Sequence, residues 1–223
     1  ATKIGDIVIS GVTRWRYGEN GWRPVSFVPV TGKKTGDIGN WISGGEPSLI
    51  RDVDGSLLLS ARSSSKSLDS PTAFDIAVWR SMDNGQTWQQ VIYRKNCRSA
   101  SPVSIDQAAD GTPFIVANYP PLMRRRDILC YWPLNAGRTD LGELKIIRDA
   151  RGEFGPAPSG SWWRIDHPTS AIVQLADRKW HSVLVYRVVD NGEIEGDADP
   201  TPQTGCYIEE VFSSGEPRPT WNF

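Results

Sequence analysis

SMDNGQTW, residues 81–88, has the pattern S-x-D-x-G-x-T-W and predicts a tight hairpin turn between two strands. Asp83 and Gly85 are residue types that such a turn uses, because glycine takes a positive φ freely and aspartate bonds its own backbone. Thr87 and Trp88 open the next strand, where the Trp88 ring would pack between strands and hold the turn. These residues therefore shape a turn, and we assign them no catalytic role.

The composition is typical of short strands joined by many turns, with ten tryptophans, 21 glycines and 16 prolines in 223 residues. The aromatic side chains also suit surfaces that stack on sugars. A net charge of −1 gives no electrostatic reason to expect nucleic acid or an anionic membrane as partner. No apolar run approaches the roughly 18 residues of a membrane span. The polar composition favours a secreted or periplasmic protein.

The cysteines are three in number and lack the spacing of a metal site. They are Cys97, Cys130 and Cys206. We expect either three buried thiols or one disulfide and a spare thiol. The sequence predicts no metal ion and no cofactor.

An internal repeat is the second strong signal. Its units are marked by Pro47, Pro102 and Pro168, which gives repeat lengths of 55 and 66 residues. Each proline lies in a short strand, and a turn and an apolar second strand follow. The second strands are expected at 56–62, 112–119 and 180–187, the third at 74–81, 127–133 and 205–212, and a fourth at 89–94 and 143–148.

Four short strands in a unit of this size predict a β-propeller blade, and no helical periodicity of useful length is present. The fold class is therefore all-β, with four-stranded antiparallel blades. We expect blades near 42–97, 98–160 and 161–223, with an additional strand pair in 1–41 around 7–9 and 25–28. Three to four blades do not close a ring, so another chain or a missing segment is expected to complete the propeller.

The first unit resembles the opening catalytic blade of the sialidases, and residues 81–88 resemble their Asp-box, or BNR repeat. The match covers about 45 residues in order and spacing. Its parts are 45–50, 54–55, 57–62, 68–71 and 76–81. The other two units resemble only the general blade pattern. The resemblance implies a six-bladed propeller and a glycoside hydrolase that acts on an anionic glycan.

By the same resemblance, Asp69 falls at the position of the general acid and Arg62 at the arginine that ends the second strand. Gly45 stands where the family has the first arginine of a triad that grips the carboxylate of sialic acid. A bidentate guanidinium is hard to replace for that task. The resemblance therefore favours a relative that acts on another anionic sugar.

Further candidates follow from the repeat, since equivalent positions of the blades converge on the ring axis. Glu46 starts an inner strand and is a candidate base, with a hydrogen bond inside its blade as the alternative. Arg62 and Arg187 end equivalent second strands, and Tyr119 takes that place in the middle unit. The two arginines would face one anion-binding pocket, or else form salt bridges at the rim.

His167 opens the third unit at the position that Glu46 holds in the first. A histidine there resembles the base of propeller polysaccharide lyases, which act on a uronate by β-elimination. Tyr186 and Arg187 would assist it. Three functions therefore stay open: a sialidase-like hydrolase with Asp69 as acid, a lyase using His167, and a glycan-binding propeller without catalysis.

Overall fold

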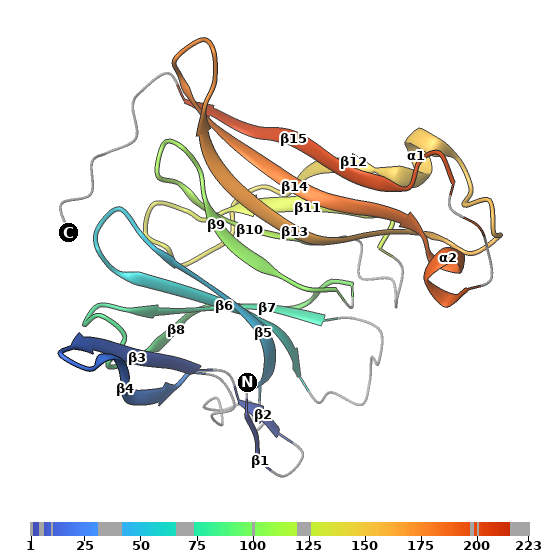
Figure 1. The fold of residues 1–223 in the computed structure, drawn as a ribbon. Coiled ribbons are helices and arrows are strands. Elements are labelled where there is room, and N and C mark those ends of the chain that lie inside the picture. Colours follow the sequence, from blue (N-terminus) through green and yellow to red (C-terminus); the bar gives the residue numbers. More distant parts are fainter. Residues whose placement is uncertain are drawn as a thin grey trace.

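The computed structural model describes residues 2–4, 7–9, 11–30, 42–65, 74–99, 101–119, 126–196, 199 and 201–214. These residues form two four-stranded sheets, one three-stranded sheet and two hairpins. Figure 1 shows the three larger sheets following one another in chain order, with the amino-terminal hairpins beside the first. No helix in the described part of the chain is long and apolar enough to cross a membrane.

The first sheet has the strand order β5-β6-β7-β8, and all neighbours are antiparallel. Its strands are β5 (Ile42–Arg51), β6 (Leu57–Ser65), β7 (Phe74–Ser81) and β8 (Gln89–Arg98). Runs of apolar side chains in β6 and β7 are buried, as expected for a sheet covered on both faces. The four-stranded blade predicted from the sequence is confirmed.

The second sheet repeats this order with β9 (Ser104–Gln107), β10 (Pro113–Asn118), β11 (Ile128–Pro133) and β12 (Lys145–Asp149). The third contains β13 (Trp163–Gln174), β14 (Trp180–Asp190) and β15 (Gly205–Ser214). Within the described residues it has three strands, and the sequence showed no fourth strand for this unit either. Two one-turn helices, α1 (Ala150–Phe154) and α2 (Asn191–Glu195), were not expected.

The amino-terminal region differs from the single strand pair expected there. It contains β1 (Thr2–Ile4), β2 (Ile7–Ile9), β3 (Gly11–Gly18) and β4 (Gly21–Pro29). Residues 7–9 pair with β1, and residues 25–28 pair with β3. The short turn before Gly21, whose φ is +86°, lets β3 and β4 close a hairpin of their own.

Each pair of neighbouring sheets shares a hydrophobic core. Phe114, Trp163 and Leu184 lie in the core between the second and third sheets. The first and second sheets enclose another core, which includes Leu58 and Ile115. A third core joins the first sheet to the β3–β4 hairpin. The sheets are therefore stacked face to face, as blades are.

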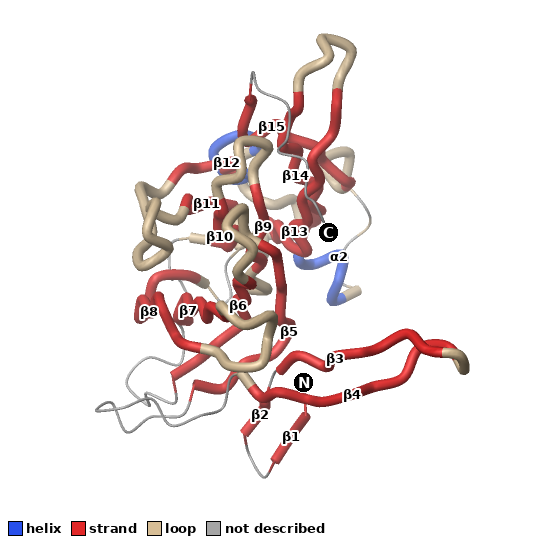
Figure 2. The backbone as a smooth tube through the Cα atoms, turned by 90° about the vertical axis from the view of Figure 1, so that its left-hand side faces the viewer, coloured by secondary structure: helices blue, strands red, loops and turns tan. Residues whose placement is uncertain are grey.

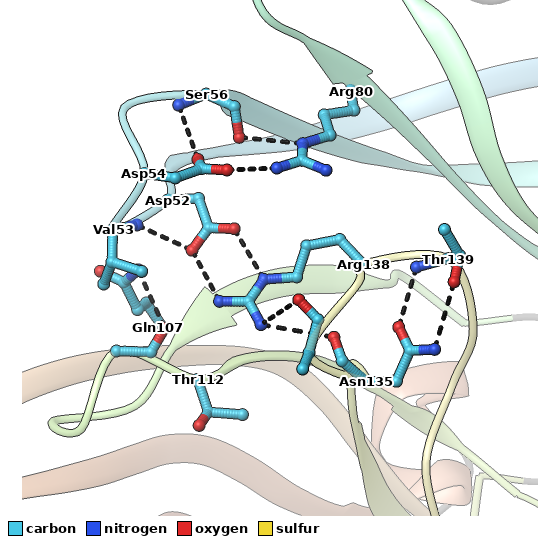
Figure 3. A network of polar contacts seen from close by, with 12 residues as sticks. Asp52, Val53, Asp54, Ser56, Arg80, Gln107, Thr112, Asn135, Arg138 and Thr139 are labelled. Carbon is cyan, nitrogen blue, oxygen red and sulfur yellow. Dashed lines mark hydrogen bonds and ion pairs between the residues drawn. The ribbon is translucent and has the colours of Figure 1, made fainter.

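A buried ion pair joins the first two sheets at one end (Figure 3). Arg138, between β11 and β12, donates from Nε to Asp52 Oδ2 at 2.7 Å and from Nη2 to Oδ1 at 3.1 Å. Asp52 lies in the β5–β6 turn and is fully buried. A bidentate guanidinium–carboxylate contact of this kind fixes two loops relative to each other.

The turn at residues 81–88 forms as predicted. Asp83 Oδ1 accepts hydrogen bonds from Ser81 Oγ at 2.8 Å, Gln86 N at 2.9 Å and Thr87 N at 2.8 Å, while Oδ2 accepts from Thr87 Oγ1 at 2.7 Å. The Trp88 ring packs against the core of the first sheet. One carboxylate thus organises the whole turn.

We expect the Asp83 turn to contribute stability only above acid pH. Hydrogen bonds from Thr87, first its hydroxyl and then its N–H, lower the pKa of Asp83 from 3.8 to about 2. A carboxyl with a depressed folded-state pKa stabilises above its unfolded pKa, and this contribution is lost as pH falls from about 4 to about 2. Melting temperatures measured across this range should fall less steeply for Asp83→Asn than for wild type. Met82→Ala in the same turn is the control, and an unchanged slope in Asp83→Asn would contradict the assignment.

Candidate functional site

Two strands, β5 and β13, carry the same irregularity at the proline of the repeat. Glu46-Pro47 lies opposite one residue of β6, and His167-Pro168 lies opposite one residue of β14. Both are β-bulges, and the residue before each proline has a positive φ, +48° at Glu46 and +52° at His167. Such a conformation is uncommon for residues other than glycine. The backbone therefore places Glu46 and His167 in equivalent positions, as the repeat predicted.

An arginine lies beside each bulge. Arg62 of β6 pairs with Gly45, and Arg187 of β14 pairs with Asp166, which is the equivalent position. Arg62 Nη1 is 3.3 Å from Glu46 Oε2, and the two side chains are 33% and 52% exposed. An ion pair this accessible is weak, so its partners are available to a ligand.

Asp166 is the centre of the second group and is fully buried. It accepts from Arg164 Nε at 2.5 Å and from Arg187 Nε at 3.1 Å, and His167 Nδ1 is 3.0 Å from its Oδ1. Arg126 Nη1 is 3.6 Å away. Burial raises the pKa of Asp166, but bonds from Arg187, His167 and Arg164 outweigh it and hold that pKa below its usual value. Three guanidinium groups thus face one carboxylate.

Arg126 connects the two groups. Its carbonyl accepts from Ile165 N at 3.0 Å, which fixes Arg126, just before β11, against β13. The pKa of Arg126 is lowered to about 10, chiefly by burial and then by repulsion from Arg164; Arg62 also acts to lower it, and Asp166 and Glu46 oppose the shift. Its charge is therefore within electrostatic range of both groups. We call the whole set the arginine cluster: Arg62, Arg126, Arg164 and Arg187 with Glu46, Asp166 and His167.

The structure does not bring Tyr186 to this cluster. Tyr186 follows Val185 and precedes Arg187 in β14, so its side chain points to the opposite face of the sheet. There its hydroxyl accepts from Arg148 Nε at 2.5 Å and donates to Glu209 Oε1 at 3.1 Å. Burial, acting against the nearby Arg148, raises the pKa of Tyr186. The phenol belongs to the core between the second and third sheets.

The remaining two predicted site residues are Tyr119 and Asp69. The Tyr119 ring makes an edge-to-face contact with Trp132 at 6.4 Å and is 39% exposed. Asp69 lies outside the described residues. The sequence reasoning missed Arg164 and Asp166 as site residues, and it interpreted Arg126 as part of a basic run that is usually a solvated turn but could touch an acidic glycan. A signal existed for Asp166, since it is aligned with Gly45 by the prolines of the repeat.

Several solved structures similar to this chain are glycoside hydrolases by their descriptions. An α-L-arabinanase from Penicillium chrysogenum, complexed with arabinobiose, matches with a TM-score of 0.51 and 17% identity over 98% of this chain and 63% of that chain. A GH93 α-L-arabinofuranosidase from Fusarium graminearum, also with arabinobiose, matches with a TM-score of 0.52 and 16% identity over 94% and 60%. The NanB sialidase from Streptococcus pneumoniae has a TM-score of only 0.47, with 15% identity over 86% and 26%, which is too weak to support an inference.

These similarities, with the blade-like sheets, identify the fold as part of a β-propeller. The chain spans less than two thirds of the length of the arabinanase and the arabinofuranosidase. A scan against protein-family models found no match, and neither did a search of the curated proteins.

Proposed function

We propose that this chain is part of a carbohydrate-active propeller whose arginine cluster binds the acid group of an anionic glycan. The observation that supports this most is the gathering of Arg126, Arg164 and Arg187 around the single carboxylate of Asp166. Arg187 remains 43% exposed, and Arg62 33%. Guanidinium groups bind carboxylate and sulfate oxygens in pairs of hydrogen bonds, so this excess of accessible arginine suits an acidic sugar.

The proteins of similar fold support the choice of a carbohydrate ligand. Two of those that exceed a TM-score of 0.5 are described with arabinobiose bound. We infer the same broad ligand class here, and the arginine cluster adds the requirement for an acid group.

Hydrolysis is the first candidate reaction. In this hypothesis Asp69 protonates the glycosidic oxygen, and Arg62 and Arg187 hold the acid group of the sugar. Glu46, which lies beside Arg62, would act as the second carboxylate. The resemblance of the first blade to sialidases implies the roles of Asp69 and Arg62, whereas the role of Glu46 is inferred from its place at the bulge.

A second candidate, β-elimination from a uronate, is favoured by the contact between His167 and Asp166. Asp166 Oδ1 accepts from His167 Nδ1 at 3.0 Å, so Nε2 is left as the basic nitrogen of a ring that is 67% exposed. Arg187 would neutralise the uronate carboxylate. His167 Nε2 would then take the proton from C5; a C4–C5 double bond forms as the C4–O bond breaks, and the departing oxygen takes up a proton.

Product analysis separates these reactions. Galacturonate oligomers are incubated with the protein, and reducing ends and ultraviolet absorbance are followed together. Hydrolysis releases reducing ends without a change in absorbance, whereas elimination gives an unsaturated product that absorbs. If the protein is a hydrolase, we expect Asp69→Asn to abolish turnover. If it is a lyase, we expect His167→Ala to lower turnover by roughly 100-fold or more.

The matched control is His181→Ala, because His181 lies elsewhere on β14 with Nδ1 at 2.8 Å from Glu210 Oε1. Turnover that survives both Asp69→Asn and His167→Ala would refute both mechanisms. Binding of the oligomer without any product would identify a non-catalytic glycan-binding propeller.

A further inference from the structure

In the part of the chain that the structure describes, no element covers the aromatic face of the β3–β4 hairpin. Alternation places Trp15 and Tyr17 of β3 on one face, and the pairing register puts Trp22 opposite Tyr17 and Phe27 opposite Thr13. These four aromatic side chains are 55%, 68%, 68% and 50% exposed, in chain order. Figure 2 shows the hairpin extending away from the three sheets. Exposed aromatic residues gathered in this way mark an interaction surface.

Other residues attach the hairpin to the first sheet. Val30 is buried, and Val12 packs against the core that contains Leu59 and Trp79. The aromatic face takes no part in that core. Its rings are therefore not required for the hairpin to be held in place.

The opposite face of the hairpin is basic. Arg14 and Arg16 alternate with the aromatic residues of β3, and Arg16 lies directly opposite Arg23 of β4. Like charges in direct cross-strand contact destabilise a sheet. No acidic side chain among the described residues forms an ion pair with these arginines, and Glu19 in the turn is the one acid of the hairpin. The hairpin is thus a positively charged ribbon, which suits an anionic ligand.

We propose that this hairpin is a second contact for the anionic glycan. This inference rests on the function proposed above and extends it from one acid group to a longer polymer. Sugar rings stack on the aromatic face, where residues two apart along a strand present rings at intervals of about 7 Å. The three arginines supply the positive potential that attracts the same acidic chain. Aromatic rings give contact area to a sugar of any charge, and the arginines favour the charged one.

The test compares two polymers and three variants. Binding of galacturonate oligomers, and of the same oligomers with methyl-esterified and therefore neutral carboxyls, is measured by titration calorimetry. We expect Tyr17→Ser with Trp22→Ser to weaken binding of both polymers by on the order of tenfold. Val25→Ser is the matched control, because Val25 is a 50% exposed apolar residue of the same hairpin without a ring. Arg187→Gln should weaken binding of the charged oligomer alone.

The outcomes separate this inference from the proposed function. If wild type binds neither polymer, the proposed function is wrong, and the inference falls with it. If wild type binds but the aromatic double variant binds equally well, the hairpin has no glycan role while the function stands. Sedimentation of the same samples gives a third outcome. Self-association that disappears in the double variant would mean that a second copy covers this face, which overturns the inference. Melting temperatures should change little, because the ring contact that the double variant removes, between Tyr17 and Trp22, lies within the hairpin and outside the core that attaches it.

Discussion

Asp166→Asn should weaken binding of anionic glycans roughly 100-fold, or about 3 kcal/mol, although it makes the cluster more positive. Electrostatic attraction alone predicts the reverse, because the substitution removes a negative charge from among three arginines. The carboxylate, however, orients Arg164 and Arg187 by hydrogen bonds of 2.5 and 3.1 Å. Without it the guanidinium groups lose the arrangement that pairs with an acid group. The dissociation constant for a galacturonate oligomer measures this directly.

Glu46→Gln is the matched control, since it removes the same charge from the same cluster. Glu46 is 52% exposed and contacts Arg62 at 3.3 Å. We expect this variant to bind the oligomer as well as wild type, or more tightly. Equal strengthening by Asp166→Asn and Glu46→Gln would show that Asp166 acts through its charge alone. Asp166→Asn should also lower the unfolding free energy, by up to about 3 kcal/mol, because it leaves arginines unpaired. Binding is therefore measured well below the melting temperature.

Arg138→Met should destabilise the fold by about 3 kcal/mol and lower the melting temperature by roughly 10 °C. The substitution leaves the fully buried carboxylate of Asp52 without its bidentate partner. An uncompensated buried charge costs more than the ion pair contributed. The double variant Asp52→Asn with Arg138→Met should therefore recover part of the loss. Thermal unfolding of the three proteins tests this.

Arg94→Met provides the comparison for that prediction. Arg94 Nη2 contacts Asp140 Oδ1 at 2.6 Å, and this pair also joins the first sheet to the loop between β11 and β12. Both side chains are about half exposed, so removal should cost less than about 1 kcal/mol. Similar losses of unfolding free energy in Arg94→Met and Arg138→Met would mean that burial of an ion pair does not determine the cost of breaking it.

Local patterns predicted much of the fold. The bounds of β7, Phe74–Ser81, agree with the expected third strand at 74–81, because the turn at 81–88 fixes where that strand ends. The prolines of the repeat also aligned Glu46 with His167, which the two bulges confirm. The start of β13 at Trp163 was missed, since the apolar residues before the bulge are out of register with those after it.

The site was harder to predict because it depends on contacts between distant segments. Arg126 lies in a basic run that reads as a solvated turn, and only its pairing with Arg164 places it beside Asp166. Tyr186 is a different case. Its neighbour Arg187 points towards the cluster, so the alternation of side chains along a strand already excluded the tyrosine from that face. Applying that alternation to the sequence would have removed it.

The bulges at Glu46 and His167 lower the stability of the fold while they position two candidate site residues. A left-handed conformation costs an ordinary residue roughly 1 kcal/mol, and glycine adopts it freely. At these two bulges the backbone is strained at the same residues whose side chains are the candidate acid–base groups. Exchanging them for glycine would relax the backbone and remove the two candidate acid–base groups of the proposed function. Redesign of this protein for new ligands can therefore begin at these two positions, where the main chain already holds side chains other than glycine at a modest penalty.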